Sequence, residues 1–135
     1  MKYQKVETII DLINKTLRNP NKKFFVDFKK VSKKEISKIS ELLEKEIKLE
    51  YHSLSSDEII HIKNRHPNIT DTDFCLIPEI IKNPDNIELG DSNTHKGLET
   101  IIYSKTIGFQ YFIVEEVRTG RKKLAVLTLY KNKIK

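Results

Sequence analysis

The sequence predicts an α+β fold in which N-terminal helices precede a four-stranded antiparallel β-sheet. Up to about residue 85, apolar residues mostly recur at helical spacing, and two Ser-x-x-Glu capping boxes mark helix starts. From about Asn86 the apolar residues recur at every second position, between short turns. A run of helices followed by a meander of strands is typical of α+β proteins. With 135 residues we expect a single domain, residues 1–135, whose first part (1–50) is helical and of uncertain role.

Composition and charge narrow the classes of function. The chain has 25 Lys and Arg residues against 19 Asp and Glu residues, a formal net charge of +6, which favours a polyanionic partner such as nucleic acid. No apolar run approaches the roughly 18 residues of a membrane span, and the N-terminus lacks the apolar stretch of a signal peptide. We therefore expect a cytoplasmic protein without a membrane partner. The single cysteine excludes an internal disulfide and a Cys-rich zinc site.

The first half of the chain contains four predicted elements. Apolar residues at helical spacing predict a helix over 3–17, and alternating residues in "KFFVDF" predict a short strand at 23–28. Ser32 and Glu35 form a capping box, so a second helix should begin near Lys33. The segment "KLEYHSL" is expected to form a brief strand.

A third helix carries the most informative residues. Ser55 and Glu58 form the second capping box, and Pro67 disfavours helical geometry at His66, which predicts a helix that ends at about Arg65. Another short helix should open at Pro78 and end before the Asn83-Pro84 pair.

The second half is expected to form the sheet, with strands near 86–89, 98–105, 109–118 and 121–131. A two-residue turn at Thr119-Gly120 would place Phe112, Val114, Ala125, Leu127 and Leu129 on one apolar face that packs against the helices. We expect a three-residue turn at 106–108 with Gly108 in the left-handed region. That turn would place Lys105 on the same face as Thr128 and Tyr130 and avoid burying its charge.

The third helix should present a polar stripe. His61 and Arg65 are four residues apart and share one side of the helix, while Ile59 and Ile62 point elsewhere. In this setting His61 could exchange protons near neutral pH while Arg65 holds an anion. The alternative is an ordinary exposed His beside an ordinary exposed Arg. His66 is interpreted as a structural residue at the helix end. His61 and His66 are five residues apart rather than four, so no metal site is expected.

Four segments resemble a known family. They are "HSLSSDEIIHIKNRHP", "IPEIIKNPDNI", "YSK" and "FIVEEVRTGRKKLAVLTLYK", in that order. Together they resemble the phage-associated branch of the BECR nucleases, the superfamily that groups barnase, EndoU, colicin ribonucleases and RelE. The resemblance covers about residues 50 to 131, so 51–135 would be the nuclease core. The fold it implies is helices followed by a four-stranded antiparallel sheet.

The resemblance implies a metal-independent endoribonuclease without cofactors, which cleaves RNA, transfer RNA included, as a toxin or as an effector of a phage or mobile element. The reaction would be attack of a ribose 2′-hydroxyl on the adjacent phosphate. The acid–base pair stays unassigned, with Glu115 as the glutamate that a barnase-like pattern would use. The residues implied are His61, Lys105, Thr128 and Tyr130 for catalysis, and Arg65, His66 and Tyr111 for phosphate binding.

Two readings of a different class stay open. The same scaffold could be a non-catalytic RNA-binding module, which keeps the basic surface but needs no histidine with a tuned pKa. It could also be a protein-interaction factor, such as an inhibitor, whose N-terminal helices contact a protein partner.

Overall fold

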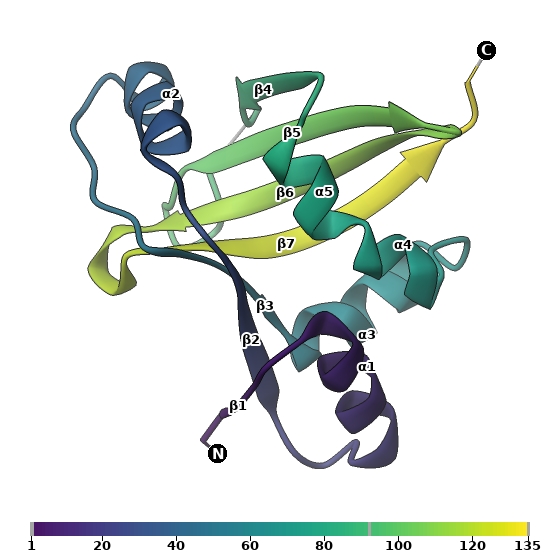
Figure 1. Cartoon of the computed structure of the whole chain (residues 1–135). Coiled ribbons are helices and arrows are strands. Elements are labelled where there is room, and N and C mark those ends of the chain that lie inside the picture. The colour runs from purple at the N-terminus through teal and green to yellow at the C-terminus, as the bar shows by residue number, and fades with distance from the viewer. Residues whose placement is uncertain (1, 92, 135) are drawn as a thin grey trace.

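The computed structural model describes residues 2–91 and 93–134. No helix in this part of the chain is long and apolar enough to span a bilayer. The elements, shown in Figure 1, are β1 (Gln4–Val6), α1 (Ile9–Arg18), β2 (Phe24–Lys30), α2 (Lys33–Leu43), β3 (Tyr51–Ser55), α3 (Ser56–Arg65), α4 (Asp71–Cys75), α5 (Ile77–Lys82), β4 (Asn86–Leu89), β5 (Thr100–Ile107), β6 (Phe109–Arg118), the single 3-10 turn η1 (Thr119–Arg121) and β7 (Lys123–Asn132).

The sheet is larger than the sequence predicts. Seven strands form one mixed sheet in the order β1-β2-β3-β7-β6-β5-β4, so the expected four-stranded antiparallel sheet is wrong. Strands β4 to β7 do form an antiparallel meander. The additional strands join through parallel pairs, β1 with β2 and β3 with β7. These pairings connect distant segments, and a local pattern of apolar residues carries no signature of them.

The N-terminus contributes a strand before its helix. Residues 4–6 pair with β2, and α1 begins only at Ile9, because the Thr8 side chain caps it by accepting a hydrogen bond from the Asp11 backbone N–H. The predicted start of this helix at residue 3 was therefore wrong. The buried side of α1, with Leu12 and Ile13, packs against β2.

The two faces of the sheet differ in how far they are covered. One face carries fully buried residues such as Tyr103, Ile113 and Leu129, and Figure 1 shows α5 in front of β6 and β7. We call this side the covered face. The opposite side, the open face, carries the half-buried Phe112, Val114, Thr128 and Tyr130 with their cross-strand partners Ser104 and Ile102.

The predicted assignment of apolar residues to faces was wrong, since Phe112 and Val114 belong to the open face. The β6–β7 turn holds four residues rather than two, with Lys122 at φ 55°, and Arg118 pairs with Lys123. A bulge in β7 then adds one residue, because Glu115 pairs with Val126 but Val114 pairs with Thr128. The two additional turn residues leave the faces unchanged, because side chains alternate with a period of two, whereas the one-residue bulge moves Thr128, Leu129 and Tyr130, relative to β6, to the opposite faces from those predicted.

The β5–β6 turn confirms one expectation and corrects another. Gly108 has φ 71°, as predicted for a residue in the left-handed region. However, Lys105 pairs with Tyr111 and not with Phe109. Tyr111 pairs with Lys131, and Phe112 pairs with Tyr130. Lys105 therefore lies on the covered face, on the other side of the sheet from Thr128 and Tyr130.

Candidate active site on the open face of the sheet

Helix α3 positions the histidines that the sequence singled out. The Ser55 hydroxyl accepts a hydrogen bond from the Glu58 backbone N–H, which starts the helix where the capping box predicted. Ile59 and Ile62 are 1% and 0% exposed, and they anchor the apolar side of the helix. His61 and Arg65 are exposed, which confirms the predicted polar stripe.

The end of α3 contacts the last strand. The ring of His66 stacks on the ring of Tyr130 with 5.6 Å between centroids and 28° between planes. Tyr130 in turn stacks on Phe112 at 4.9 Å. Thr128 lies two residues before Tyr130, so its side chain is on the same open face. The structure therefore brings together three predicted site residues, His66, Thr128 and Tyr130, from segments more than sixty residues apart.

The phenol of Tyr130 is held in its neutral form. Burial raises the pKa of Tyr130 above its ordinary value of 10, and the negative charges of Asp91 and Glu88 raise it further. A phenol that stays protonated at neutral pH can donate a hydrogen bond or a proton but cannot act as a base. This restricts Tyr130 to a donor role on the open face.

Lys105 and Tyr111, two other predicted site residues, lie on the covered face, away from His66 and Tyr130. Lys105 donates from Nζ to the Asn83 backbone oxygen, and its Nζ lies 3.8 Å from Asp85. Tyr111 is 3% exposed and donates its hydroxyl to Asp73 at 2.6 Å, which fastens α4 to β6. Burial and Asp73 raise the pKa of Tyr111 to about 12. Neither residue shares a face with His66 and Tyr130.

Glu58 is a titratable group that the sequence suggested only as a helix cap. Burial raises the pKa of Glu58 to about 7, and Asp57 and Glu116 add to the rise while Arg118 opposes it. Glu116 and Arg118 pair with β7 residues on the open face, so the first turn of α3 lies at its edge. A carboxyl group that titrates near neutrality is suited to proton transfer. No local sequence signal marked this role.

Glu58→Gln is expected to stabilise the protein above pH 7. Because the folded pKa lies above the ordinary 4.5, the contribution of Glu58 is complete below pH 4.5 and is lost as pH rises through 7. The variant should gain about 1–2 kcal/mol at pH 8, a value reduced for the partial exposure of the group. Urea unfolding at pH 5 and pH 8 measures this. The matched control is Glu46→Gln at an exposed carboxylate. Equal stability of wild type and Glu58→Gln at pH 8 would contradict the assignment.

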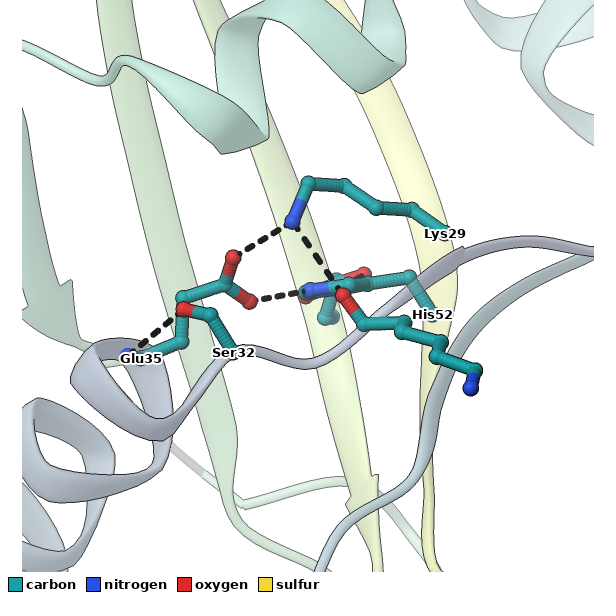
Figure 2. Close-up of polar contacts among 6 residues, drawn as sticks. Lys29, Ser32, Glu35 and His52 are labelled. Atoms are coloured by element: carbon teal, nitrogen blue, oxygen red, sulfur yellow. Dashed lines mark hydrogen bonds and ion pairs between the residues drawn. The ribbon is translucent and has the colours of Figure 1, made fainter.

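A second cluster of charged groups is buried beneath α2 on the covered face (Figure 2). His52 on β3 is 0% exposed, and its two ring nitrogens contact two carboxylates. Nε2 lies 2.5 Å from Glu35 of α2, and Nδ1 lies 2.8 Å from Glu115 of β6. Lys29 of β2 also contacts Glu35, at 2.7 Å, so one carboxylate ties α2 to two strands.

Burial and charge compete in this cluster. Burial alone would lower the pKa of His52, but Glu115 and Glu35 raise it to about 9, so the ring is an imidazolium at neutral pH. Burial alone would raise the pKa of Glu35, but the hydrogen bonds from His52 and Lys29 lower it. Two cations thus neutralise two carboxylates inside the protein.

The buried cluster also explains the role of Glu115, which the sequence offered as a possible base. Its carboxylate is 0% exposed, bonded to His52 and on the covered face, so it does not reach the open face that carries His66 and Tyr130. The sequence placed Glu35 only in a capping box and assigned no role to His52. The one available signal was that Glu115 alternates with the apolar Ile113 and Val117 in the predicted strand.

The comparison with protein families decides the class of protein. A family model described as PBECR3, phage-Barnase-EndoU-ColicinE5/D-RelE like nuclease3, matches residues 29–135. The chain belongs to this nuclease family. The match confirms the predicted resemblance and extends it towards the N-terminus, so that α2 and the end of β2 also belong to the matched region. Neither a curated protein nor a solved structure matches the chain.

Both the open-face residues and the buried charged cluster lie within the part of the chain that the family model matches. The open face with His66 and Tyr130 lies in the matched region, and so do Lys29, Glu35 and His52 of the buried cluster. Within residues 2–91 and 93–134, no group of three or more His, Cys, Asp or Glu side chains could hold a metal ion. The nuclease therefore presents a stacked histidine–tyrosine pair on a half-open sheet face, next to the exposed Arg65 of α3.

Proposed function

We propose that this nuclease is an endoribonuclease whose active site is the open face beside α3. The observation that carries the proposal is the stacking of His66 on Tyr130, with Thr128 on the same face. It places an imidazole ring next to two hydroxyl groups, on one face of the sheet. Attack by the ribose 2′-hydroxyl on the adjacent phosphate needs such groups and needs no covalent enzyme intermediate.

Each of these residues has a separate role in the proposed reaction. His66 accepts or returns the proton that moves between the 2′-hydroxyl and the leaving 5′-oxygen. Tyr130 and Thr128 donate hydrogen bonds to phosphate oxygens as negative charge builds on them. Contact with Tyr130 favours His66 over His61 for the proton transfer. Glu58, whose pKa is about 7, lies at the other end of α3, about 12 Å from His66 along the helix, so it does not act on the same phosphate.

Binding of the RNA backbone is proposed to use the exposed side of α3. His61 and Arg65 are exposed there, and no hydrogen bond or ion pair engages Arg65 within the described residues. A guanidinium in this state is available to a phosphate group. The net charge of +6 adds a general attraction for a polyanion.

The substrates proposed are cellular RNAs, transfer RNA among them, and the biological role proposed is that of a toxin or phage-encoded effector. Incubation of total RNA and a DNA oligomer with the full chain in EDTA tests the activity. We expect RNA to be cleaved and DNA to stay intact, since DNA has no 2′-hydroxyl. If RNA stays intact at high protein concentration, the proposal is overturned, and the alternative of an RNA-binding module without catalysis would be favoured.

Binding of RNA by Arg65 should be visible in the salt dependence. For a single-stranded, uncleavable 2′-O-methyl RNA, the slope of log Kd against log salt concentration should fall by about 0.7 in Arg65→Ala, because one phosphate contact is lost. Arg18→Ala, at an exposed arginine of α1, is the matched control and should keep the wild-type slope. Equal slopes for wild type and Arg65→Ala would remove Arg65 from the interface.

A further inference from the structure

A cavity lies on the covered face of the sheet, on the opposite side from the proposed active site. It has a volume of about 650 Å³ and is bordered by α2, by the end of α5 and by β4 and β5. Lys105 and Glu35, which both line it, belong to the covered side of the sheet. The sheet therefore separates this cavity from His66 and Tyr130.

Four lysines from three elements converge on the cavity. Lys34 and Lys38 come from α2, Lys82 from α5 and Lys105 from β5. Lys34 and Lys38 are four residues apart, so they extend from the same side of their helix. Lysines that line one hollow repel one another, and an anion bound between them lowers that repulsion.

The carboxylates at the cavity are already neutralised. Glu35 contacts His52 at 2.5 Å and Lys29 at 2.7 Å. Asp85 accepts the Thr106 backbone N–H at 2.8 Å and lies 3.8 Å from Lys105. By contrast, Lys34, Lys38 and Lys82 make no side-chain hydrogen bond or ion pair within the part of the chain that the structure describes. These three charges are free to bind an external anion.

The rest of the lining suits a nucleoside. Pro84 and Ile87 are half-buried and supply apolar surface that a base or ribose can cover, and Asn83 and Asn86 line the cavity beside them. A cavity of this volume is within the range of about 300–1,000 Å³ that small-molecule sites occupy. Inorganic phosphate would use the lysines alone and leave the apolar surface exposed to water.

The buried cluster holds this site in shape. Glu35 lies between Lys33 and Lys38 on α2, and its bonds to β2 and β3 fix the helix against the sheet (Figure 2). The Ser32 side chain, which lines the cavity, caps the same helix through the Glu35 backbone N–H. The helix that carries Lys34 and Lys38 is thereby fixed before a ligand arrives, which lowers the entropic cost of binding.

We propose that this cavity binds a nucleoside phosphate, either as a free nucleotide or as the phosphorylated 5′ end of an RNA. The lysines hold the phosphate, and the isoleucine and proline side chains cover the base. The proposal stands apart from the cleavage reaction, because it concerns the opposite face of the sheet and requires no bond to break.

Calorimetric titration of the full chain tests the proposal. The probes are the four ribonucleoside 5′-monophosphates, inorganic phosphate, and a short 2′-O-methyl oligomer with and without a 5′-phosphate. The proteins are wild type, Lys34→Ala/Lys38→Ala, and the control Lys33→Ala/Lys48→Ala. The control removes the same charge from exposed lysines outside the cavity. We expect at least one monophosphate to bind about tenfold more weakly to the cavity variant, a change of about 1.4 kcal/mol, and equally to wild type and control.

Each result decides the proposal. Binding of the 5′-phosphorylated oligomer alongside the monophosphate identifies an RNA end as the ligand, and binding of the monophosphate alone identifies a free nucleotide. The proposal is overturned if no nucleotide binds, if inorganic phosphate binds as tightly as the nucleotides, or if the control loses as much affinity as the cavity variant. It is also overturned if Arg65→Ala/His66→Ala weakens nucleotide binding as strongly, because the ligand would then lie on the open face.

Discussion

Replacement of His52 by alanine is expected to lower the free energy of unfolding by about 3–5 kcal/mol, because it leaves two buried carboxylates without their shared cation. Glu115 is 0% exposed and would lose its imidazolium partner, while Glu35 would keep only Lys29. A loss of this size is a large part of the stability of a small domain. Urea unfolding at pH 7, followed by circular dichroism, measures it.

The controls separate the loss of charge from the loss of packing. His95→Ala, at an exposed histidine, should change stability by less than about 0.5 kcal/mol. His52→Gln keeps one hydrogen bond but no charge and should retain only part of the stability. A loss below about 1 kcal/mol for His52→Ala would show that the cluster does not hold α2 to the sheet.

The stabilisation by His52 should also depend on pH. The folded pKa of about 9 lies above the ordinary 6.5, so the contribution of the charged ring is complete below pH 6.5 and is lost as pH rises through 9. The difference in unfolding free energy between wild type and His52→Gln should therefore shrink between about pH 6.5 and pH 9. A constant difference across this range would mean that His52 is not charged in the folded protein.

Replacement of His66 by alanine is expected to lower the rate of RNA cleavage by about 10²–10⁴-fold, the usual contribution of a positioned acid–base group. The fold should survive, since loss of a partly exposed ring stack costs about 0.5–1.5 kcal/mol. Tyr130→Phe keeps the stack and removes the hydroxyl, so its effect on the rate reports hydrogen-bond donation alone. Single-turnover cleavage of an oligoribonucleotide measures both variants.

The comparison with His61 tests which histidine transfers the proton. His61→Ala should lower cleavage less than His66→Ala, because the ring of His61 is exposed and makes no ring contact with the sheet within the described residues. His95→Ala serves as the control for an exposed histidine. A larger loss in His61→Ala than in His66→Ala would return the acid–base role to His61.

The elements with local signals were predicted well. Helix α3 runs from Ser56 to Arg65, between the Ser55 cap and Pro67, as its capping box and proline indicated. Helix α2 begins at Lys33 for the same reason. Capping boxes and prolines act on neighbouring backbone groups, so a single sequence contains the information needed to place them.

The faces of the sheet were harder to predict, because they depend on register. One residue more or fewer in a turn moves every later side chain to the other side. The one-residue bulge in β7 moved Tyr130 to the opposite face from Tyr111, because it adds Leu127 between the partners of Glu115 and Val114. No glycine in β7 marks the bulge in the sequence. The same bulge separates Lys105 from Tyr130, since Lys105 shares a face with Tyr111.

Only part of the proposed site could be predicted from the sequence. His66, Thr128 and Tyr130 lie in the motifs that carried the family resemblance, and the structure brings them together. Glu58 and His52 owe their shifted pKa values to burial and to charges from distant strands. Such shifts arise only when the chain folds, so the sequence could name these residues but not their state.

Cleavage of a DNA oligomer that contains one ribonucleotide tests the central claim most directly. The account predicts a single cut on the 3′ side of that ribose in EDTA, leaving a 2′,3′-cyclic phosphate. The cut should be at least about 10²-fold slower with His66→Ala than with wild type. Cleavage at deoxyribonucleotide positions, or an equal rate with His66→Ala in folded protein, would contradict RNA cleavage by 2′-hydroxyl attack at the open face of the sheet.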